Sequence, residues 1–219
     1  MNKEFDYIVI GAGIAGCCLA YFLSKYSKSI LLIDRNSQVA FGASGAAGAF
    51  LSPLLGKPND FKDLVTKSLI FSTNFYKNLG EELVSNCGVC RIPKNEEDRD
   101  KFESYKPYMD FKYTQMDDGY FFEIGSQVTP SLICEKLTKD IEKKLSYNVI
   151  KLEQNENSTW IINDEICAKN IILTTGADVK HIKEDYFDIR GVWGQKIDVS
   201  TTTETKINYH KECSVSKAS

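Results

Sequence analysis

Residues 7–23, YIVIGAGIAGCCLAYFL, decide the fold of this chain. An apolar run typical of a buried parallel strand leads into Gly11, Gly13 and Gly16, and a helical pattern follows at once. Glycines at this spacing permit a tight turn, a close approach of the backbone to a pyrophosphate, and close packing of helix on strand. The stretch therefore predicts a loop that binds the diphosphate of a nucleotide.

A second strand and an acidic residue complete the motif. Residues 29–33, SILLI, are apolar, and Asp34 follows 23 residues after Gly11. A carboxylate at this position can accept hydrogen bonds from ribose hydroxyls. Ile14 and Ala15 begin the intervening helix, whose N-terminal N–H groups can face the anion. Strand, helix and strand in about 30 residues form a βαβ unit, so we expect a Rossmann-like α/β domain with a parallel sheet.

Arg35 leaves two interpretations open. Its guanidinium either accommodates the 2′-phosphate of NADP or lies in solvent beside the adenine. The second is favoured, because the neighbouring Asp34 would repel a 2′-phosphate.

A segment of small residues follows the second strand. Residues 41–49, FGASGAAGA, stand where an NAD-binding domain normally continues through another helix. They are too small for a core strand and too apolar for a flexible linker, which indicates backbone that another group approaches closely. The GxGxxG unit, the acidic strand end and this GASG segment together resemble the D-amino acid oxidase and glycine oxidase family of FAD enzymes. The resemblance implies that Ser44 and Gly45 contact the FAD pyrophosphate, and that Gly48 and Ala49 line the flavin.

Later segments resemble the same family in the family's order. YNVIKLEQ is similar to a strand whose valine, here Val149, meets the adenine through its backbone, and IILTTGA closes on the cofactor at Gly176. The resemblance implies a discontinuous FAD-binding domain, residues 1–85 and 128–188, and part of a mixed-sheet substrate domain, residues 86–127 and 189–219. Members of the family usually continue well beyond this length, so the chain resembles a fragment or a truncated product.

The resemblance also implies an activity, oxidation of the C–N bond of an amine or amino acid by hydride transfer to the flavin. Residues 47–57, AGAFLSPLLGK, most resemble the oxidase half of bifunctional enzymes that modify the wobble uridine of tRNA, where a carboxymethyl group is removed from an aminomethyl uridine. Two alternatives are a free amino acid substrate, such as glycine or sarcosine, and a non-catalytic nucleotide-binding module. No catalytic side chain is predicted. Arg190 is the predicted ligand of a substrate carboxylate, with Arg91 as the other local candidate.

Net charge, apolar runs and cysteine content limit the partners and the compartment that we expect for this protein. The net charge of −3 gives no general attraction to nucleic acid, and no apolar run approaches the roughly 20 residues of a membrane span. The N-terminus lacks the features of a secretory signal, and seven cysteines form no evident disulfide framework, so a cytoplasmic location is expected. The oligomeric state is left open.

Cys87-x-x-Cys90 and His210-x-x-Cys213 raise the possibility of a zinc or redox site. Cys87 and Cys90 would face opposite ways along an alternating strand, so no metal is predicted.

Overall fold

The computed structural model describes residues 4–116, 118–179 and 189–216. These residues form two compact units, one of Met1–Ala47 with Pro130–Gln195 and one of Gly48–Thr129 with Lys196–Ser219. Residues 48–85, which the sequence assigns to the first domain, fall in the second unit because their strands pair there with residues 126–128. The predicted boundary at 188/189 adjoins residues 180–188, which lie outside the described part of the chain.

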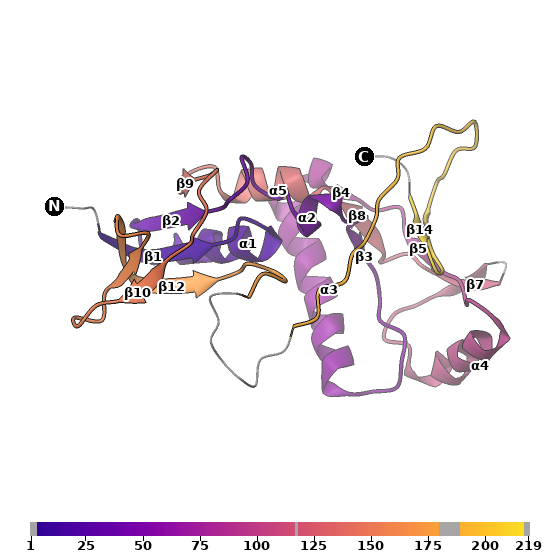
Figure 1. The fold of residues 1–219 in the computed structure, drawn as a ribbon. Coiled ribbons are helices and arrows are strands. Elements are labelled where there is room, and N and C mark those ends of the chain that lie inside the picture. Colours follow the sequence, from indigo (N-terminus) through magenta and orange to yellow (C-terminus); the bar gives the residue numbers. More distant parts are fainter. Residues whose placement is uncertain (1–3, 117, 180–188, 217–219) are drawn as a thin grey trace. The chain divides into compact units, whose positions relative to one another are not determined.

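The first unit is built on a six-stranded sheet with the order β10-β11-β12-β1-β2-β9 (Figure 1). Strands β12, β1, β2 and β9 run parallel, and β10 and β11 add an antiparallel extension. Helices α1 and α5 pack against each other. The elements are β1 (Glu4–Ile10), α1 (Ile14–Leu23), β2 (Ile30–Ile33), α2 (Ala43–Ala46), α5 (Pro130–Leu137), β9 (Glu142–Lys144), β10 (Leu152–Gln154), β11 (Trp160–Ile162) and β12 (Ile166–Leu173). The predicted Rossmann-like α/β fold is confirmed.

The core of this unit lies where the apolar runs predict it. All four residues of β2 are buried, as expected of a parallel strand covered on both faces. One buried cluster joins side chains of the sheet to the loop before β10; its members are Phe5, Ile8, Ile10, Leu31, Ile33, Val149, Ile162, Ile166 and Ala168. The sheet ends that carry the glycine loop are therefore held by a well-packed interior.

Two local predictions in this unit are wrong. The sequence of residues 130–145, PSLICEKLTKDIEKKL, predicts one helix, but the helix ends at Leu137 and the chain then pairs with β2 as the edge strand β9. Lys143 and Lys144 consequently lie in a strand and not on a helix surface. The strand expected over 147–154 begins only at Leu152, so Val149 lies in the loop before it. At residues 142–144 sheet pairing overrides the helical pattern, whereas before β10 the amides of Ile150 and Lys151 donate to Asn163 Oδ1.

The second unit contains a five-stranded sheet, order β14-β13-β5-β7-β6, and a three-stranded sheet, order β3-β8-β4. Only β13 and β5 pair in parallel there, so the larger sheet is mixed. The elements are β3 (Phe50–Leu51), α3 (Asp60–Leu79), η1 (Glu81–Leu83), β4 (Val84–Ser85), β5 (Val89–Arg91), α4 (Glu96–Tyr105), η2 (Lys106–Tyr108), β6 (Thr114–Met116), β7 (Gly119–Phe122), β8 (Ser126–Val128), β13 (Asn208–His210) and β14 (Ser214–Val215).

The two longer helices of the second unit each begin after a capping asparagine. The side chain of Asn59 accepts a hydrogen bond from the Lys62 amide at the start of α3, and Asn95 accepts one from the Asp98 amide at the start of α4. A small aromatic core of Val89, Phe102, Tyr120 and Phe122 lies beneath the larger sheet. Across both units, the described helices include none that is long and apolar enough to cross a membrane.

Candidate nucleotide-binding site

The glycine loop follows β1 at the carboxyl ends of the parallel strands. Gly11 has φ +111°, a conformation that favours glycine, and a Cβ there would lie 2.4 Å from the Thr174 carbonyl oxygen. A Cβ on Gly16 would lie 1.9 Å from the Gly11 carbonyl oxygen. Neither position tolerates a side chain without a backbone shift, so helix α1 begins in direct contact with the strand ends, as the sequence predicts.

The N-terminus of α1 presents donors for an anion. The first bond of the helix runs from the Cys17 amide to the Gly13 carbonyl at 2.9 Å, so the amides of Gly13, Ile14, Ala15 and Gly16 find no partner inside the helix. Ser44 Oγ accepts a hydrogen bond from the Ile14 amide at 3.0 Å. The fold thus brings Ser44, 30 residues away in sequence, to the end of α1, where the helix dipole also favours negative charge.

Asp34 also stabilises the glycine loop, a role that the sequence did not predict. Its Oδ2 accepts a hydrogen bond from the Ala12 amide at 2.7 Å, and its Oδ1 accepts bonds from the Asn36 amide at 2.8 Å and the Asn36 side chain at 2.9 Å. The carboxylate therefore fastens the glycine loop to the end of β2. A carboxylate offers about four lone-pair sites, so Asp34 can still accept a hydrogen bond from a hydroxyl group.

Two other segments, the loop before β10 and the end of β12, lie beside the glycine loop and Asp34. The Tyr147 amide donates to the Asp34 carbonyl at 2.9 Å, which brings the segment just before Val149 beside the acid. Thr174 Oγ1 lies 2.8 Å from the Gly11 carbonyl oxygen and 3.0 Å from that of Ile10. Gly176 has φ +65°, and a Cβ there would meet open space. Thr174 was missed by the sequence reasoning, although its place directly after an apolar strand was a usable signal.

These features fit a bound dinucleotide. Outward-facing amides at the start of α1, a carboxylate at the end of β2 and open space at Gly176 lie within one unit. Cys17, also in α1, has a different character. A hydrogen bond with Cys134 and burial raise the pKa of the Cys17 thiol, which keeps it protonated and argues against a nucleophilic role.

The other predicted residues have mixed placements. Arg35 Nη1 pairs with Asp178 Oδ2 at 3.0 Å on an exposed surface. A Cβ on Gly45 would lie 2.2 Å from the Ala40 carbonyl oxygen, so glycine is required there for packing. Gly48 and Ala49 belong to the second unit, where the Ala49 carbonyl accepts a bond from the Val128 amide at 3.0 Å. Arg190 lies exposed in a segment that is neither helix nor strand.

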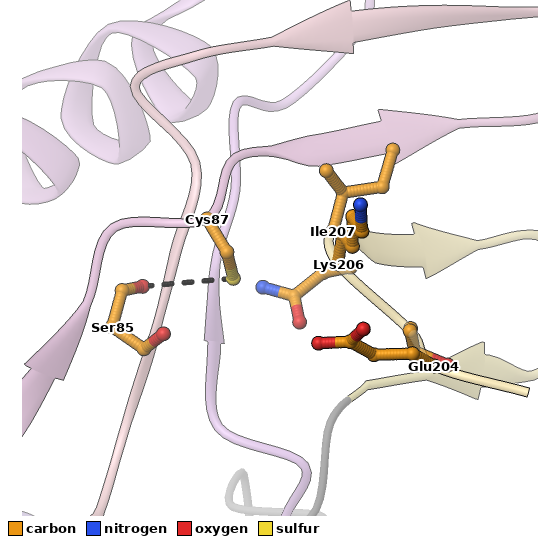
Figure 2. A pocket seen from close by; sticks show the side chains of 7 residues that line it. Ser85, Cys87, Glu204, Lys206 and Ile207 are labelled. Atoms are coloured by element: carbon orange, nitrogen blue, oxygen red, sulfur yellow. Dashed lines mark hydrogen bonds between the residues drawn. The ribbon is translucent and has the colours of Figure 1, made fainter.

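A cavity of about 260 Å³ lies within the second unit (Figure 2). Ser85 and Cys87 line it from one segment, and Glu204, Lys206 and Ile207 line it from the segment before β13. Cys87 Sγ contacts the Ser85 carbonyl oxygen at 3.8 Å, while Cys90 is buried within β5. Among the residues that the structure describes, no three His, Cys, Asp or Glu side chains are grouped to hold a metal.

Comparison with known families identifies the chain. Residues 6–214 match the family described as FAD dependent oxidoreductase (DAO). The chain belongs to this family. The match confirms the predicted family and its cofactor, FAD.

Curated relatives share the family at low identity. A tRNA 5-methylaminomethyl-2-thiouridine biosynthesis bifunctional protein MnmC of Campylobacter fetus is 23% identical over 159 residues, 71% of this chain and 26% of the relative. The protein of the same name from Legionella pneumophila strain Lens is 24% identical over 231 residues, 93% of this chain and 34% of the relative. A Bacillus subtilis glycine oxidase is 33% identical over 91 residues, 41% of this chain and 23% of the relative.

Solved structures show the same fold. Glycine oxidase from Geobacillus kaustophilus superposes with a TM-score of 0.67 at 14% identity, covering 81% of this chain and 56% of that one. An FAD-bound L-alpha-glycerophosphate oxidase from Mycoplasma pneumoniae gives 0.64 at 18% identity, covering 77% and 53%. The chain therefore spans between a quarter and a third of the curated relatives and about half of these solved structures.

Proposed function

We propose that the chain binds FAD through its first unit and forms part of an oxidoreductase that oxidises the C–N bond of an amine. The observation that carries this proposal is the meeting of the glycine loop, Asp34 and Ser44 at the N-terminus of α1, in a chain that matches the family over residues 6–214. The first unit is then the FAD-binding part, and the second is part of the substrate domain.

Each residue of the site has a proposed role. The amides of Gly13, Ala15 and Gly16 bind the pyrophosphate, the Ile14 amide holds Ser44 so that its hydroxyl can donate to the same group, and Gly11 gives the loop its turn. Asp34 accepts hydrogen bonds from the ribose while it holds the loop. Val149 and Gly176 flank the nucleotide from the ends of neighbouring segments, with Arg35 at the exposed edge. Gly45 maintains the backbone of the GASG segment, and Gly48 and Ala49 approach the flavin.

The chemistry rests on a bound cofactor and an oriented substrate. When bound, FAD supplies the acceptor for the hydride that leaves the carbon next to nitrogen. The protein binds the amine, holds its α C–H bond in line and keeps the charged phosphates away from that bond. No side chain needs to act as an acid or base if the amine binds in its neutral form, which agrees with the lack of a predicted catalytic residue.

The substrate that we propose is a carboxymethylaminomethyl group on the wobble uridine of tRNA, in the cytoplasm. The names of the relatives from Campylobacter and Legionella support it. The glycine oxidase relative, which matches a shorter part of the chain, supports the alternative of a free amino acid. A nucleotide-binding module without catalysis is the third candidate, favoured only if no amine reduces the flavin.

Cofactor binding is tested by purifying the chain and recording its visible spectrum. We expect a yellow protein that releases FAD on denaturation. Ser44→Ala should weaken FAD binding about tenfold, because it removes a hydroxyl from the phosphate site. Ser24→Ala is the matched control, because Ser24 caps the other end of the same helix and should leave affinity unchanged. A colourless protein that takes up no added FAD would refute the proposal.

The substrate is tested on the FAD-loaded protein under anaerobic conditions. Carboxymethylaminomethyl uridine in tRNA, glycine and sarcosine are added in turn, and bleaching of the flavin absorbance is followed. Bleaching by the tRNA alone supports the proposed substrate, and bleaching by a free amino acid alone supports the alternative. Stable FAD binding without bleaching by any of them supports the binding module.

A further inference from the structure

Arg91 differs from the other arginines of the chain in its surroundings. The sequence contains four arginines, and Arg91, in β5, is the one that is not exposed. The exposed Arg35 and Arg99 each pair with an aspartate, at 3.0 and 3.1 Å. Within the described residues, no carboxylate lies within ion-pair distance of Arg91. Among the described residues, Arg190 also has no ion pair but is exposed to solvent, so Arg91 is the arginine that is both partly buried and without a carboxylate partner.

The contacts that Arg91 does make are neutral. Nη1 donates to Ser52 Oγ at 3.3 Å and to the Pro53 carbonyl at 3.2 Å. Nε is shielded from solvent and has no hydrogen-bond partner among the described residues. Burial lowers the pKa of Arg91, only partly offset by the more distant Asp98. A desolvated guanidinium normally has an anion beside it, because its charge is costly to bury alone.

The residues in register with Arg91 supply no negative charge. In the sheet, Arg91 is in register with His210 on β13 and with Tyr120 on β7. Burial lowers the pKa of His210, and the charges of Arg91 and Lys94 lower it further. The neighbouring carboxylate of Asp98 accepts a hydrogen bond from the Lys94 amide at 3.0 Å, so it is already engaged.

A second unsatisfied group lies on the same face of this sheet. Asn208 is in register with Val89, two residues before Arg91, so its side chain points to the same face as that of Arg91. Asn208 is fully buried, and neither its Oδ1 nor its Nδ2 has a hydrogen-bond partner among the described residues. Buried polar atoms are paired in the great majority of cases, so two such residues on one face indicate a missing polar partner.

We propose that Arg91 forms a binding site for the carboxylate group of a small molecule. Nη1 is occupied, and the edge formed by Nε and Nη2 presents two parallel N–H donors, the geometry that matches a planar carboxylate. The site does not depend on FAD, and it replaces the exposed Arg190 as the arginine expected to hold a carboxylate.

The site is tested by thermal unfolding of the 219-residue chain, without added FAD, in rising concentrations of acetate. Acetamide, sodium chloride at equal ionic strength and inorganic phosphate are the comparison additives. We expect the melting temperature to rise saturably with acetate and to stay nearly constant with acetamide and chloride. A larger rise with phosphate than with acetate would overturn the assignment to a carboxylate.

Variants separate binding from structure. Arg91→Met should lose the acetate response and, without acetate, should melt at or above the temperature of the wild type, because it removes a buried charge that has no counter-ion. Arg190→Met is the matched control and should respond to acetate as the wild type does. A less stable Arg91→Met, together with a wild type that ignores acetate, would show that Arg91 only ties β5 to residues 52–53.

A conservative variant covers the case in which Arg91→Met does not fold. Arg91→Lys keeps the charge but loses the planar pair of donors, so its acetate affinity should fall about tenfold. Equal acetate affinity in Arg91→Lys and the wild type would overturn the bidentate site. Because the measured quantity is the acetate dependence of the melting temperature and no FAD is added, a failure here is distinct from a failure to bind FAD.

Discussion

The two units differ in how many of their buried polar side-chain atoms have a hydrogen-bond partner. In the first unit, the Asp34 carboxylate accepts hydrogen bonds from the amides of Ala12 and Asn36. Ser44 Oγ accepts one from the Ile14 amide. In the second unit lie all the described side-chain atoms that are buried without a hydrogen-bond partner, which belong to Thr73, Arg91, Ser126 and Asn208. Each such atom costs about 1–3 kcal/mol. Within the described residues, the buried side-chain polar atoms of the first unit have hydrogen-bond partners, whereas these four residues of the second unit keep atoms without one.

The largest expected effect tests the tight packing of the first unit. Gly16→Ala should lower the free energy of unfolding by about 3 kcal/mol, because its Cβ would lie 1.9 Å from the Gly11 carbonyl oxygen. Urea unfolding followed by the fluorescence of Trp160, in the same unit, measures the loss. Gly42→Ala is the control, since a Cβ there meets nothing within 4 Å. Equal stability of the two variants would contradict the close contact of α1 with β1.

An intermediate effect is expected from the ion pair between Lys62 of α3 and Asp110 in the second unit. Lys62 is 3% exposed, and its Nζ lies 2.9 Å from Asp110 Oδ2 and also donates to the Tyr108 carbonyl. Lys62→Met should cost about 2 kcal/mol, less than a fully buried pair because Asp110 is a third exposed. Chemical unfolding measures the cost, and Lys67→Met on the exposed side of α3 should leave stability nearly unchanged.

The stabilisation by the Lys62–Asp110 ion pair should depend on pH. Burial opposes ionisation of Asp110, but hydrogen bonds from Lys62 and Thr66 outweigh it and lower the pKa of Asp110. The stabilisation is therefore present above the unfolded pKa of about 4 and is lost as the pH falls further. In Lys62→Met this acid-dependent loss should shrink. An unchanged acid profile would show that the ion pair does not stabilise the second unit.

The smallest effect concerns the edge of the first unit. Burial and a hydrogen bond to Glu165 raise the pKa of Tyr147 to about 12. The unfolded chain releases this proton near pH 10, so the contribution is complete below pH 10 and is lost as the pH rises to about 12. Because Tyr147 is only half-buried, we expect at most about 1 kcal/mol.

The alkaline dependence is measured by unfolding between neutral pH and pH 12 for the wild type and Tyr147→Phe. The variant should show a flatter profile over that range. Tyr26→Phe is the control, since Tyr26 is 86% exposed and should leave the profile unchanged. If Tyr147→Phe and Tyr26→Phe gave the same alkaline profile, Tyr147 would not be coupled to folding.

Much of the site could be predicted because its signals are local. Gly11 and Gly16 mark backbone positions where a Cβ cannot fit, and such positions are visible in sequence as glycines at fixed spacing. Asp34 is visible because it directly follows an apolar strand. The place of Thr174 directly after an apolar strand is visible in the sequence, but its contact with Gly11 joins residues 163 apart in the chain and is not.

The amino-acid sequence by itself determined the βαβ unit, the diphosphate loop and the family, because strand and helix periodicity and glycine spacing express local backbone requirements. Only the tertiary structure decided that residues 48–85 belong with the second unit, that residues 142–144 pair as a strand, and that Arg91 is partly buried with no carboxylate partner among the described residues. These outcomes depend on which distant segments exclude water from one another and which partners they leave, and the free energy of that burial is set by the whole fold.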